Sequence, residues 1–277
     1  MKQVAPLRYD VIFKKAFSHP SLFTALVKDF IGIQLKIDEV ENDKAFVPSV
    51  GSVATKFDLF AEDKKNRIIV EVQHAHYDDT YERFVYYQCS AMVQTIISSN
   101  NYRFPVTVIT IVFFTGKKTP SPDSGIIVHD FEPKDFVTGK LLDKIYQRKH
   151  KLIFVFTNDS AHTNTPSNCR EWMQAINDSL DEKVDEEKYT NPSIQELFCV
   201  IEKDKITPEE RASMKDEYNQ EEAKKKAEEK GRNEEKEKTV RNLKAIGVLT
   251  EEQIASVTGL SLERVKALGN TENDQND

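Results

Sequence analysis

Two segments with the character of β-strands, separated by a short polar turn, constrain this chain more than any other feature. The strand-like segments are residues 53–60 (VATKFDLF) and 67–73 (RIIVEVQ), and the polar turn is 63–66 (DKKN). Aliphatic, aromatic and β-branched residues favour strands, and a short polar connection between two strands is typical of a hairpin. We therefore expect a β-hairpin in the N-terminal third of the chain.

The turn also suggests a register that places two acidic residues opposite each other. If Asp63 pairs with Asn66, the pairing advances by one residue on each strand until Asp58 lies opposite Glu71. Opposed side chains have Cβ atoms about 4.5–5.5 Å apart, and two carboxylates that close repel unless a proton or cation lies between them. Mg²⁺ accepts such an arrangement, with water and substrate phosphate completing its shell. The alternative is an exposed hairpin face carrying ordinary surface charges.

The surroundings of Glu71 favour the first alternative. Glu71 lies inside the apolar run IIVEV, in a strand that reads as buried on both faces. A buried carboxylate without a partner is destabilising by several kcal/mol. The hairpin thus predicts a functional pair at Asp58 and Glu71.

Hydrophobic spacing elsewhere in residues 1–205 alternates between helical and strand-like. In the first forty residues apolar side chains recur at helical intervals, and Pro20 separates two helical segments. Further helices are expected at 79–99, 168–179 and 193–203, and strands at 106–114, 126–129 and 151–157. This order predicts an α/β layer structure in one compact domain that ends near residue 205.

The composition changes abruptly beyond Pro208. Residues 209–238 carry eleven acidic and nine basic side chains, with Glu and Lys paired four residues apart, so we expect a charged helical linker over 206–246. A capping box at 250–253 (TEEQ) opens a short helical hairpin over 247–269. The hairpin resembles a helix-turn-helix, but no third helix is evident, and a hairpin used only for packing is an equal alternative. Residues 270–277 are expected to be disordered.

Composition excludes several classes of protein. No segment approaches the roughly 20 apolar residues that span a bilayer, no secretory signal is present, and the three cysteines are too few and too scattered for a disulfide framework. We expect a cytoplasmic protein with no membrane association. A P-loop, a dinucleotide fingerprint and a G-x-S-x-G elbow are all missing. The formal charge of -7 does not favour nucleic-acid binding, although a local basic rim would be compatible with it.

The hairpin and the helix before it resemble a known family. Asp58 followed by Glu71-x-Gln73 resembles the core of PD-(D/E)XK nucleases. More narrowly, the chain resembles the recombination-promoting nuclease and putative transposase (Rpn-type) family, in which a D-x-x-F-K-x-x-F helix precedes the hairpin. Residues 10–17 (DVIFKKAF) match that helix, and a tyrosine-rich helix and a charged tail follow in the same order.

The resemblance implies a restriction-endonuclease-like fold, with a mixed β-sheet flanked by helices and a helical C-terminal extension. It also implies a DNA endonuclease that uses Mg²⁺, or Mn²⁺, to polarise the scissile phosphate and activate water, in a recombination or mobile-element context. Asp58 and Glu71 would be the metal ligands. Gln73 stands where the wider class has lysine, and a glutamine can orient water but supplies no charge. Lys56, on the same strand as Asp58, could restore a cation or could be a solvated lysine.

Further residues are candidates for the site or for DNA contact. Asp10 is either a third site acid or the cap of the first helix. Lys14 could contact phosphate, Arg83 and Gln88 could approach DNA from the helix at 79–99, and Arg148 and Lys149 form a candidate basic rim. His74 and His76 form an H-x-H without a convincing third ligand, which favours histidines at a strand end over a transition-metal site.

A second hypothesis is a catalytically inactive nuclease fold that serves as a DNA-binding or regulatory module. Gln73 and the acidic net charge favour it, whereas the intact Asp58 and Glu71 favour the enzyme. The C-terminal helices could also mediate assembly into a homo-oligomer.

Overall fold

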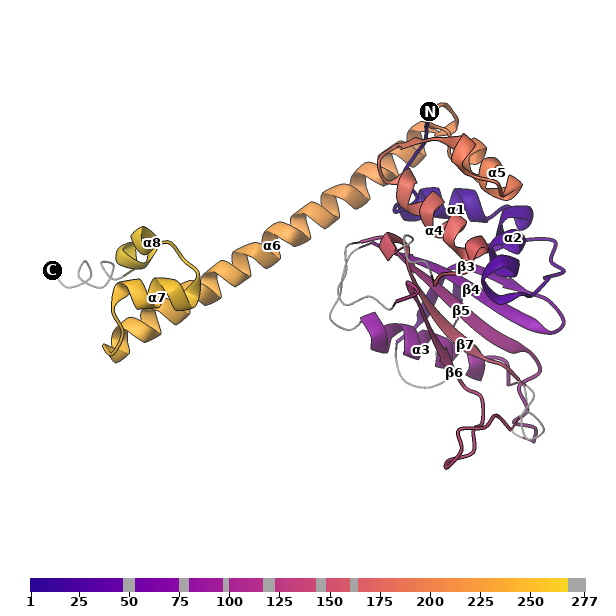
Figure 1. Cartoon of the computed structure of the whole chain (residues 1–277), viewed down its shortest axis with the longest axis horizontal. Helices are drawn as coiled ribbons and strands as arrows, with labels where there is room; N and C mark the ends of the chain where they lie inside the picture. The colour runs from indigo at the N-terminus through magenta and orange to yellow at the C-terminus, as the bar shows by residue number, and fades with distance from the viewer. Residues whose placement is uncertain are drawn as a thin grey trace. The chain divides into compact units, whose positions relative to one another are not determined.

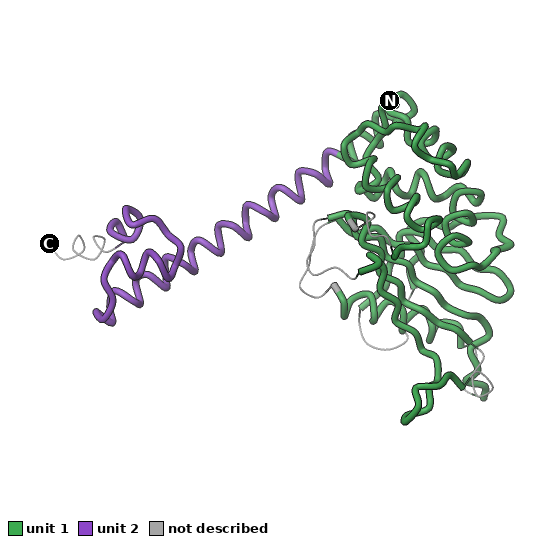
Figure 2. Tube along the Cα trace, viewed as in Figure 1, with its two compact units in different colours: residues 1–214 green, residues 215–277 purple. Residues whose placement is uncertain are grey.

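The structure, a computed structural model, describes residues 1–46, 53–74, 80–96, 100–116, 123–142, 148–159 and 164–268. It forms two compact units, Met1–Met214 and Lys215–Asp277 (Figure 2). No helix among the described residues is long and apolar enough to cross a membrane.

A six-stranded mixed sheet forms the centre of the first unit (Figure 1). Its strands, in spatial order, are β2 (Glu41–Phe46), β3 (Thr55–Glu62), β4 (Asn66–Gln73), β5 (Thr107–Phe114), β7 (Lys151–Phe156) and β6 (Ile126–Asp130). β2, β3 and β4 are antiparallel neighbours, β4, β5 and β7 run parallel, and β6 returns antiparallel to β7. A separate two-stranded sheet pairs β1 (Lys2–Gln3) with β8 (Lys183–Val184). The α/β expectation is confirmed.

Helices cover both faces of the six-stranded sheet (Figure 1). On one face lie α1 (Asp10–Phe17), α2 (Pro20–Ile31), α4 (Ser167–Ser179) and α5 (Pro192–Val200), and on the other lies α3 (Thr80–Val93). Short 3₁₀ turns occur at Thr157–Asp159, Glu186–Lys188 and Lys203–Lys205. Because β5 is covered on both sides, its residues are apolar at nearly every position, as in other doubly covered parallel strands.

The predicted hairpin and its register are confirmed. β3 and β4 pair from Glu62 with Arg67 to Leu59 with Val70, the register that a turn closed by Asp63 and Asn66 requires. Asp63 closes the turn itself, because its backbone N–H donates to Asn66 O at 2.8 Å and its carboxylate accepts from the backbone N–H of Asn66 at 2.8 Å. The next residues along the two strands are Asp58 and Glu71.

Other elements differ from the expectation in extent. The first forty residues are helical only in α1 and α2, and α3 ends at Val93 rather than extending to residue 99. β2, with the sequence ENDKAF, was not expected. It is an edge strand whose residues remain partly exposed on both faces, so it has no alternation of apolar and polar residues for the sequence to reveal.

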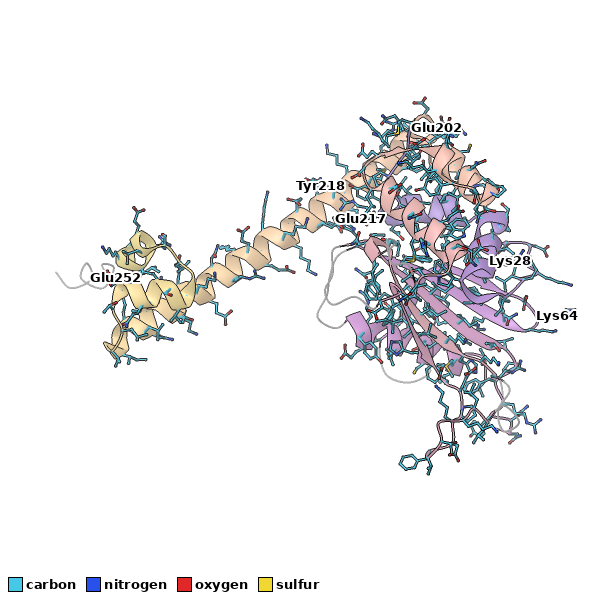
Figure 3. All side chains as sticks on the ribbon, in the orientation of Figure 1. Lys28, Lys64, Glu202, Glu217, Tyr218 and Glu252 are labelled. Atoms are coloured by element: carbon cyan, nitrogen blue, oxygen red, sulfur yellow. The ribbon has the colours of Figure 1, made fainter. Side chains whose placement is uncertain are left out.

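The charged segment forms one long helix, α6 (Pro208–Ile246). Its first turns belong to the first unit, where Glu210 pairs with Lys15 at 2.9 Å and Met214 packs against the core. Further along, its side chains project into solvent in many directions (Figure 3). The helix contains a single buried residue, Val240.

The second unit has its own small core. α7 (Glu251–Thr258) begins with the predicted capping box, and Gly259 in a left-handed conformation (φ 67°) ends it before α8 (Leu262–Ala267). Buried side chains from the end of α6, from α7, and from α8 and its C-cap form the core: Val240, Ile254, Val265 and Leu268. The end of α6 is therefore the third helix that the sequence did not reveal. The sequence does not mark the end of α6 as a separate helix, because it continues the charged helix without a break.

Candidate active site

The two carboxyl groups of Asp58 and Glu71 lie where the ladder between β3 and β4 ends. The Asp58 backbone N–H donates to Glu71 Oε1 at 3.2 Å, and the Val72 backbone N–H donates to Asp58 Oδ2 at 3.1 Å. Each carboxyl group thus accepts a backbone N–H of the opposite strand. Backbone donors at a buried site need acceptors, so these two bonds hold both side chains in place.

Simultaneous ionisation of the Asp58 and Glu71 carboxyl groups is unfavourable, because the pKa of each is raised. Burial raises the pKa of Asp58 to about 6, with a further contribution from the Asp10 carboxylate, while the Val72 N–H and Lys14 act in the opposite direction. Burial and the Asp58 carboxylate raise the pKa of Glu71 well above its ordinary value. The side chains also share a hydrogen bond, so a proton between them relieves the repulsion.

Lys14 of α1 is the cation beside Asp58. Its ammonium lies 2.7 Å from Asp10 Oδ2, 2.6 Å from Asp43 Oδ1 and 4.0 Å from Asp58 Oδ1, and its side chain is only 12% exposed. Burial lowers the pKa of Lys14, but hydrogen bonds to Asp10 and Asp43 outweigh it, so the pKa is raised and the lysine stays charged. Lys56 pairs with Asp43 at 2.9 Å and is 66% exposed.

On the other side of the pair, Gln73 and Glu71 meet Arg83 of α3. Arg83 Nη2 donates to Gln73 Oε1, and the guanidinium opposes the rise in the pKa of Glu71. The neighbouring His74 is bonded through Nε2 to Arg8 at 2.6 Å and through Nδ1 to Thr115 Oγ1 at 2.9 Å. An arginine can only donate, so Nε2 accepts and Nδ1 carries the proton. His76 lies outside the described residues.

The sequence left two alternatives for Asp10, a third acid of the site or the cap of the first helix, and the structure bears on the second of them. The N-cap of α1 is Tyr9, with no capping bond from its side chain, and Asp10 is the first residue of the helix. Its carboxylate pairs with Lys14 and is close enough to Asp58 to raise the pKa of that residue. Asp10 therefore lies at the edge of the site and is not the helix cap.

Three of the residues considered for DNA contact are not brought to this site. Gln88 is fully buried, where it donates to Val108 O at 3.1 Å and accepts from Thr110 Oγ1 at 2.6 Å, so DNA cannot reach it. Arg148 and Lys149 precede β7, whose Phe154 is level with Glu71 across the sheet. At about 3.3 Å per residue, Lys149 lies roughly 16 Å further along the strand direction.

Two residues of the site were not found from the sequence. Asp43 lies on the unexpected edge strand β2, and the pairing of that strand with β3 is what brings it close to Asp58. Arg8 lies just before α1 and reaches His74, a strand end 66 positions away in the sequence. No local pattern marks either residue, because both contacts depend on how distant elements pack.

The donor set suits a hard divalent cation. The raised pKa values of Asp58 and Glu71 show that two negative charges are unfavourable here unless a cation compensates them. No group of three or more His, Cys, Asp or Glu side chains that could hold a metal is found among the described residues. Mg²⁺ does not need such a cage, because one or two carboxylates suffice when water and substrate phosphates complete its shell. The residues therefore fit such an ion with Asp58 and Glu71 as ligands.

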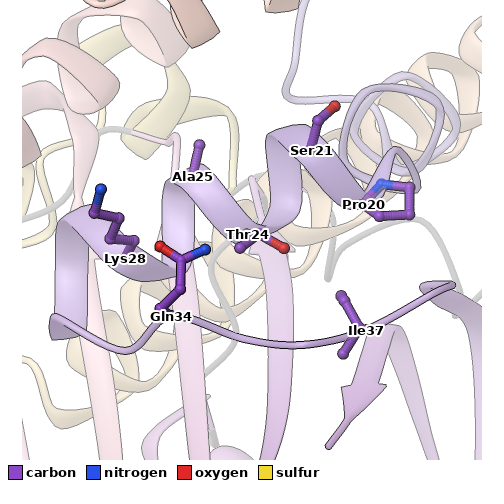
Figure 4. Close-up of a pocket in the computed structure, with 7 residues that line it drawn as sticks. All are labelled: Pro20, Ser21, Thr24, Ala25, Lys28, Gln34 and Ile37. Atoms are coloured by element: carbon purple, nitrogen blue, oxygen red, sulfur yellow. The ribbon is translucent and has the colours of Figure 1, made fainter.

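Two of the shallow grooves on the described part of the first unit differ in their relation to the site. One, of about 440 Å³, adjoins the site, and it is lined in part by Asp10, Lys14, Asp43 and Asn42. The other, of about 420 Å³, follows α2 and is lined by Pro20, Ser21, Thr24, Ala25, Lys28, Gln34 and Ile37 (Figure 4). Among the described residues that line this second groove, Lys28 alone is charged, and none of them is a residue of the site.

Comparison with known proteins agrees with this geometry. The family model described as PD-(D/E)XK nuclease family transposase matches residues 7–244, which include α1, the hairpin and most of the charged helix α6. None of the curated proteins and none of the solved structures compared with the chain matches it. The mixed sheet flanked by helices confirms the restriction-endonuclease-like fold. The chain belongs to the PD-(D/E)XK nuclease family of transposases.

Proposed function

We propose that this protein is an endonuclease that hydrolyses phosphodiester bonds in DNA with the help of Mg²⁺ or Mn²⁺. The observation that carries the proposal is the pair of carboxyl groups of half-buried Asp58 and buried Glu71, each held by a backbone N–H of the opposite strand, in a chain of the PD-(D/E)XK nuclease family. A divalent ion bound there would polarise the scissile phosphate and favour the ionised form of an attacking water.

The protein itself supplies positioning and charge. Asp58 and Glu71 are fixed by the opposite strand, so they are preorganised to hold the ion. Lys14 on one side and Arg83 on the other place positive charge next to them, in a protein whose formal net charge is -7. Gln73, held by Arg83, would orient water or a phosphate oxygen through its amide.

Nicking of supercoiled plasmid tests this proposal. Wild type should nick DNA with Mg²⁺ or Mn²⁺, and the product should disappear with EDTA and in Asp58→Ala. Glu62→Gln is a matched control, because Glu62 is an exposed acid on the same strand, paired with Arg67 at 2.5 Å. Equal nicking by wild type and Asp58→Ala would contradict the proposal.

Gln73 in place of lysine favours one other function, that of an inactive nuclease fold that only binds DNA. The nicking experiment, with a duplex-binding measurement beside it, separates the two. If wild type binds a labelled duplex but nicks no plasmid with either metal, the binding module becomes the better account. Assembly through the C-terminal helices is a separate proposal, and loss of self-association on removal of residues 215–277 in a sedimentation experiment would support it.

A further inference from the structure

Asp43 of the edge strand β2 lies in line with the two carboxyl residues of the candidate site. β2 and β3 pair Asn42 with Leu59 and Lys44 with Phe57, so Asp43 is the residue across from Asp58. The register of β3 and β4 in turn places Glu71 next in line. Three neighbouring strands therefore each carry one acidic residue at the same level of the sheet.

The backbone of Asp43 is unusual for a strand. Its φ is 55°, in the left-handed region, and Glu182 is the only other described non-glycine residue with positive φ. Aspartate enters this region more readily than most residues, but the conformation is still unfavourable and persists only where the surrounding contacts hold it. The residues on either side keep their regular pairing with β3, so the distortion is confined to Asp43.

The contacts that hold Asp43 are two lysines. Asp43 Oδ1 accepts from Lys14 Nζ at 2.6 Å and from Lys56 Nζ at 2.9 Å. These bonds, with burial opposing them, lower the pKa of Asp43, so its carboxylate stays charged. Lys14 is thus held from two directions, by Asp10 of its own helix and by Asp43 of the sheet.

We propose that Asp43 is a positioning residue of the active site, which holds the Lys14 ammonium beside Asp58 as the fixed positive charge that Gln73 cannot supply. This inference rests on the proposed nuclease function. An ion pair between residues four apart on one helix leaves a lysine free to change rotamer, whereas a second carboxylate from another element restricts it to one place. A fixed charge stabilises the charge that develops on a scissile phosphate better than one that must reorganise.

A double-mutant cycle in the plasmid assay tests how Asp43 acts. Asp43→Asn keeps the size of the side chain but weakens its hold on Lys14, so kcat should fall about tenfold while KM changes less than about twofold. In a Lys14→Met background the same substitution should cause no further loss, because Asp43 acts through Lys14. Glu41→Gln is the control, since Glu41 lies on the same strand and pairs with Lys44 at 2.7 Å. Unchanged kcat in Asp43→Asn, or an equal loss in both backgrounds, would overturn the inference.

A second measurement needs neither metal nor DNA. Reductive methylation of the folded protein, read by mass spectrometry, reports how freely each lysine amine reacts. Asp43→Asn should raise the labelling rate of Lys14 several-fold and leave exposed Lys64 unchanged, at an unaltered melting temperature. If wild type nicks no DNA, the proposed function fails while this comparison still decides whether Asp43 holds Lys14. Equal labelling of Lys14 in wild type and variant would refute the positioning role.

Discussion

Replacement of Asp58 by asparagine should stabilise the metal-free protein at the same time as it removes the proposed metal ligand. Burial and the Asp10 carboxylate raise the pKa of Asp58 from 3.8 to about 6, and its side chain is 23% exposed. The folded state therefore prefers the protonated form. That contribution to stability is fully present below pH 3.8 and is lost as the pH rises through about 6.

The size of the effect follows from the same values. A pKa raised from 3.8 to about 6 corresponds to about 3 kcal/mol of unfolding free energy lost at pH 8. Asparagine is neutral at every pH and can still accept the Val72 N–H, and the pKa of about 6 already includes the attraction between the Asp58 carboxylate and Lys14. We therefore expect a net gain of about 2–3 kcal/mol at pH 8, or a Tm higher by about 4–12 °C for a unit of this size. At pH 5, which lies between the two pKa values, the gain should be roughly half as large.

Thermal unfolding followed by tryptophan fluorescence measures this effect in the first unit. Trp172 is the only tryptophan of the chain and is fully buried in the core of that unit. Melts with EDTA at pH 5 and pH 8 give the gain in stability. Melts with Mg²⁺ at pH 8 should raise the Tm of wild type but not that of Asp58→Asn, because a ligand stabilises only a fold that binds it.

The control is Glu62→Gln, the same chemical change at an exposed, ion-paired position of β3. It should alter the free energy of unfolding by no more than about 0.5–1 kcal/mol, in the destabilising direction. The reasoning is refuted if Asp58→Asn lowers the Tm equally at pH 5 and pH 8. It is also refuted if Mg²⁺ stabilises wild type and variant alike.

Three further predictions concern other parts of the chain. Gln88→Ala should lower the unfolding free energy by about 2–4 kcal/mol, measured by urea denaturation. The reason is that the Val108 carbonyl and the Thr110 hydroxyl lose their hydrogen bonds to the Gln88 side chain in the protein interior. The variant should not weaken DNA binding by the folded fraction. Burial, and to a smaller extent Arg148, lowers the pKa of His150 to about 4. Wild type should therefore lose stability relative to His150→Gln as the pH falls from about 6.5 towards 4, which thermal melts across that pH range would measure. Ile254→Ala should cost the second unit about 2–5 kcal/mol, so that limited proteolysis cleaves within 247–268 while the first unit stays intact.

Much of the fold could be read from local sequence because the signals were local. The apolar β5 and the two strands of the hairpin are short runs of strand-forming residues, and the Asp63–Asn66 turn sets their register through its own hydrogen bonds. α1, α2 and the capping box of α7 follow from helical spacing, Pro20 and the Thr250–Gln253 pair. Each of these depends on residues close in sequence.

The edge strand, the third helix of the second unit and half of the site depend on distant contacts. β2 is polar, and its partner lies across a connection of several residues, so only the assembled sheet identifies it. The end of α6 has too few apolar residues to be recognised until α7 and α8 fold back on it. Lys56, near Asp58 in sequence, is the exposed partner of Asp43, whereas Lys14 reaches Asp58 from another element.

The sequence by itself determined the hairpin, its register and therefore the neighbouring positions of Asp58 and Glu71, because backbone hydrogen bonding allows one pairing once the turn is set. Only the tertiary structure decided which cations face those carboxylates and which candidates are buried away from them. Charge and burial around the site come from helices and strands that pack together from distant parts of the chain, and their packing has no local signature.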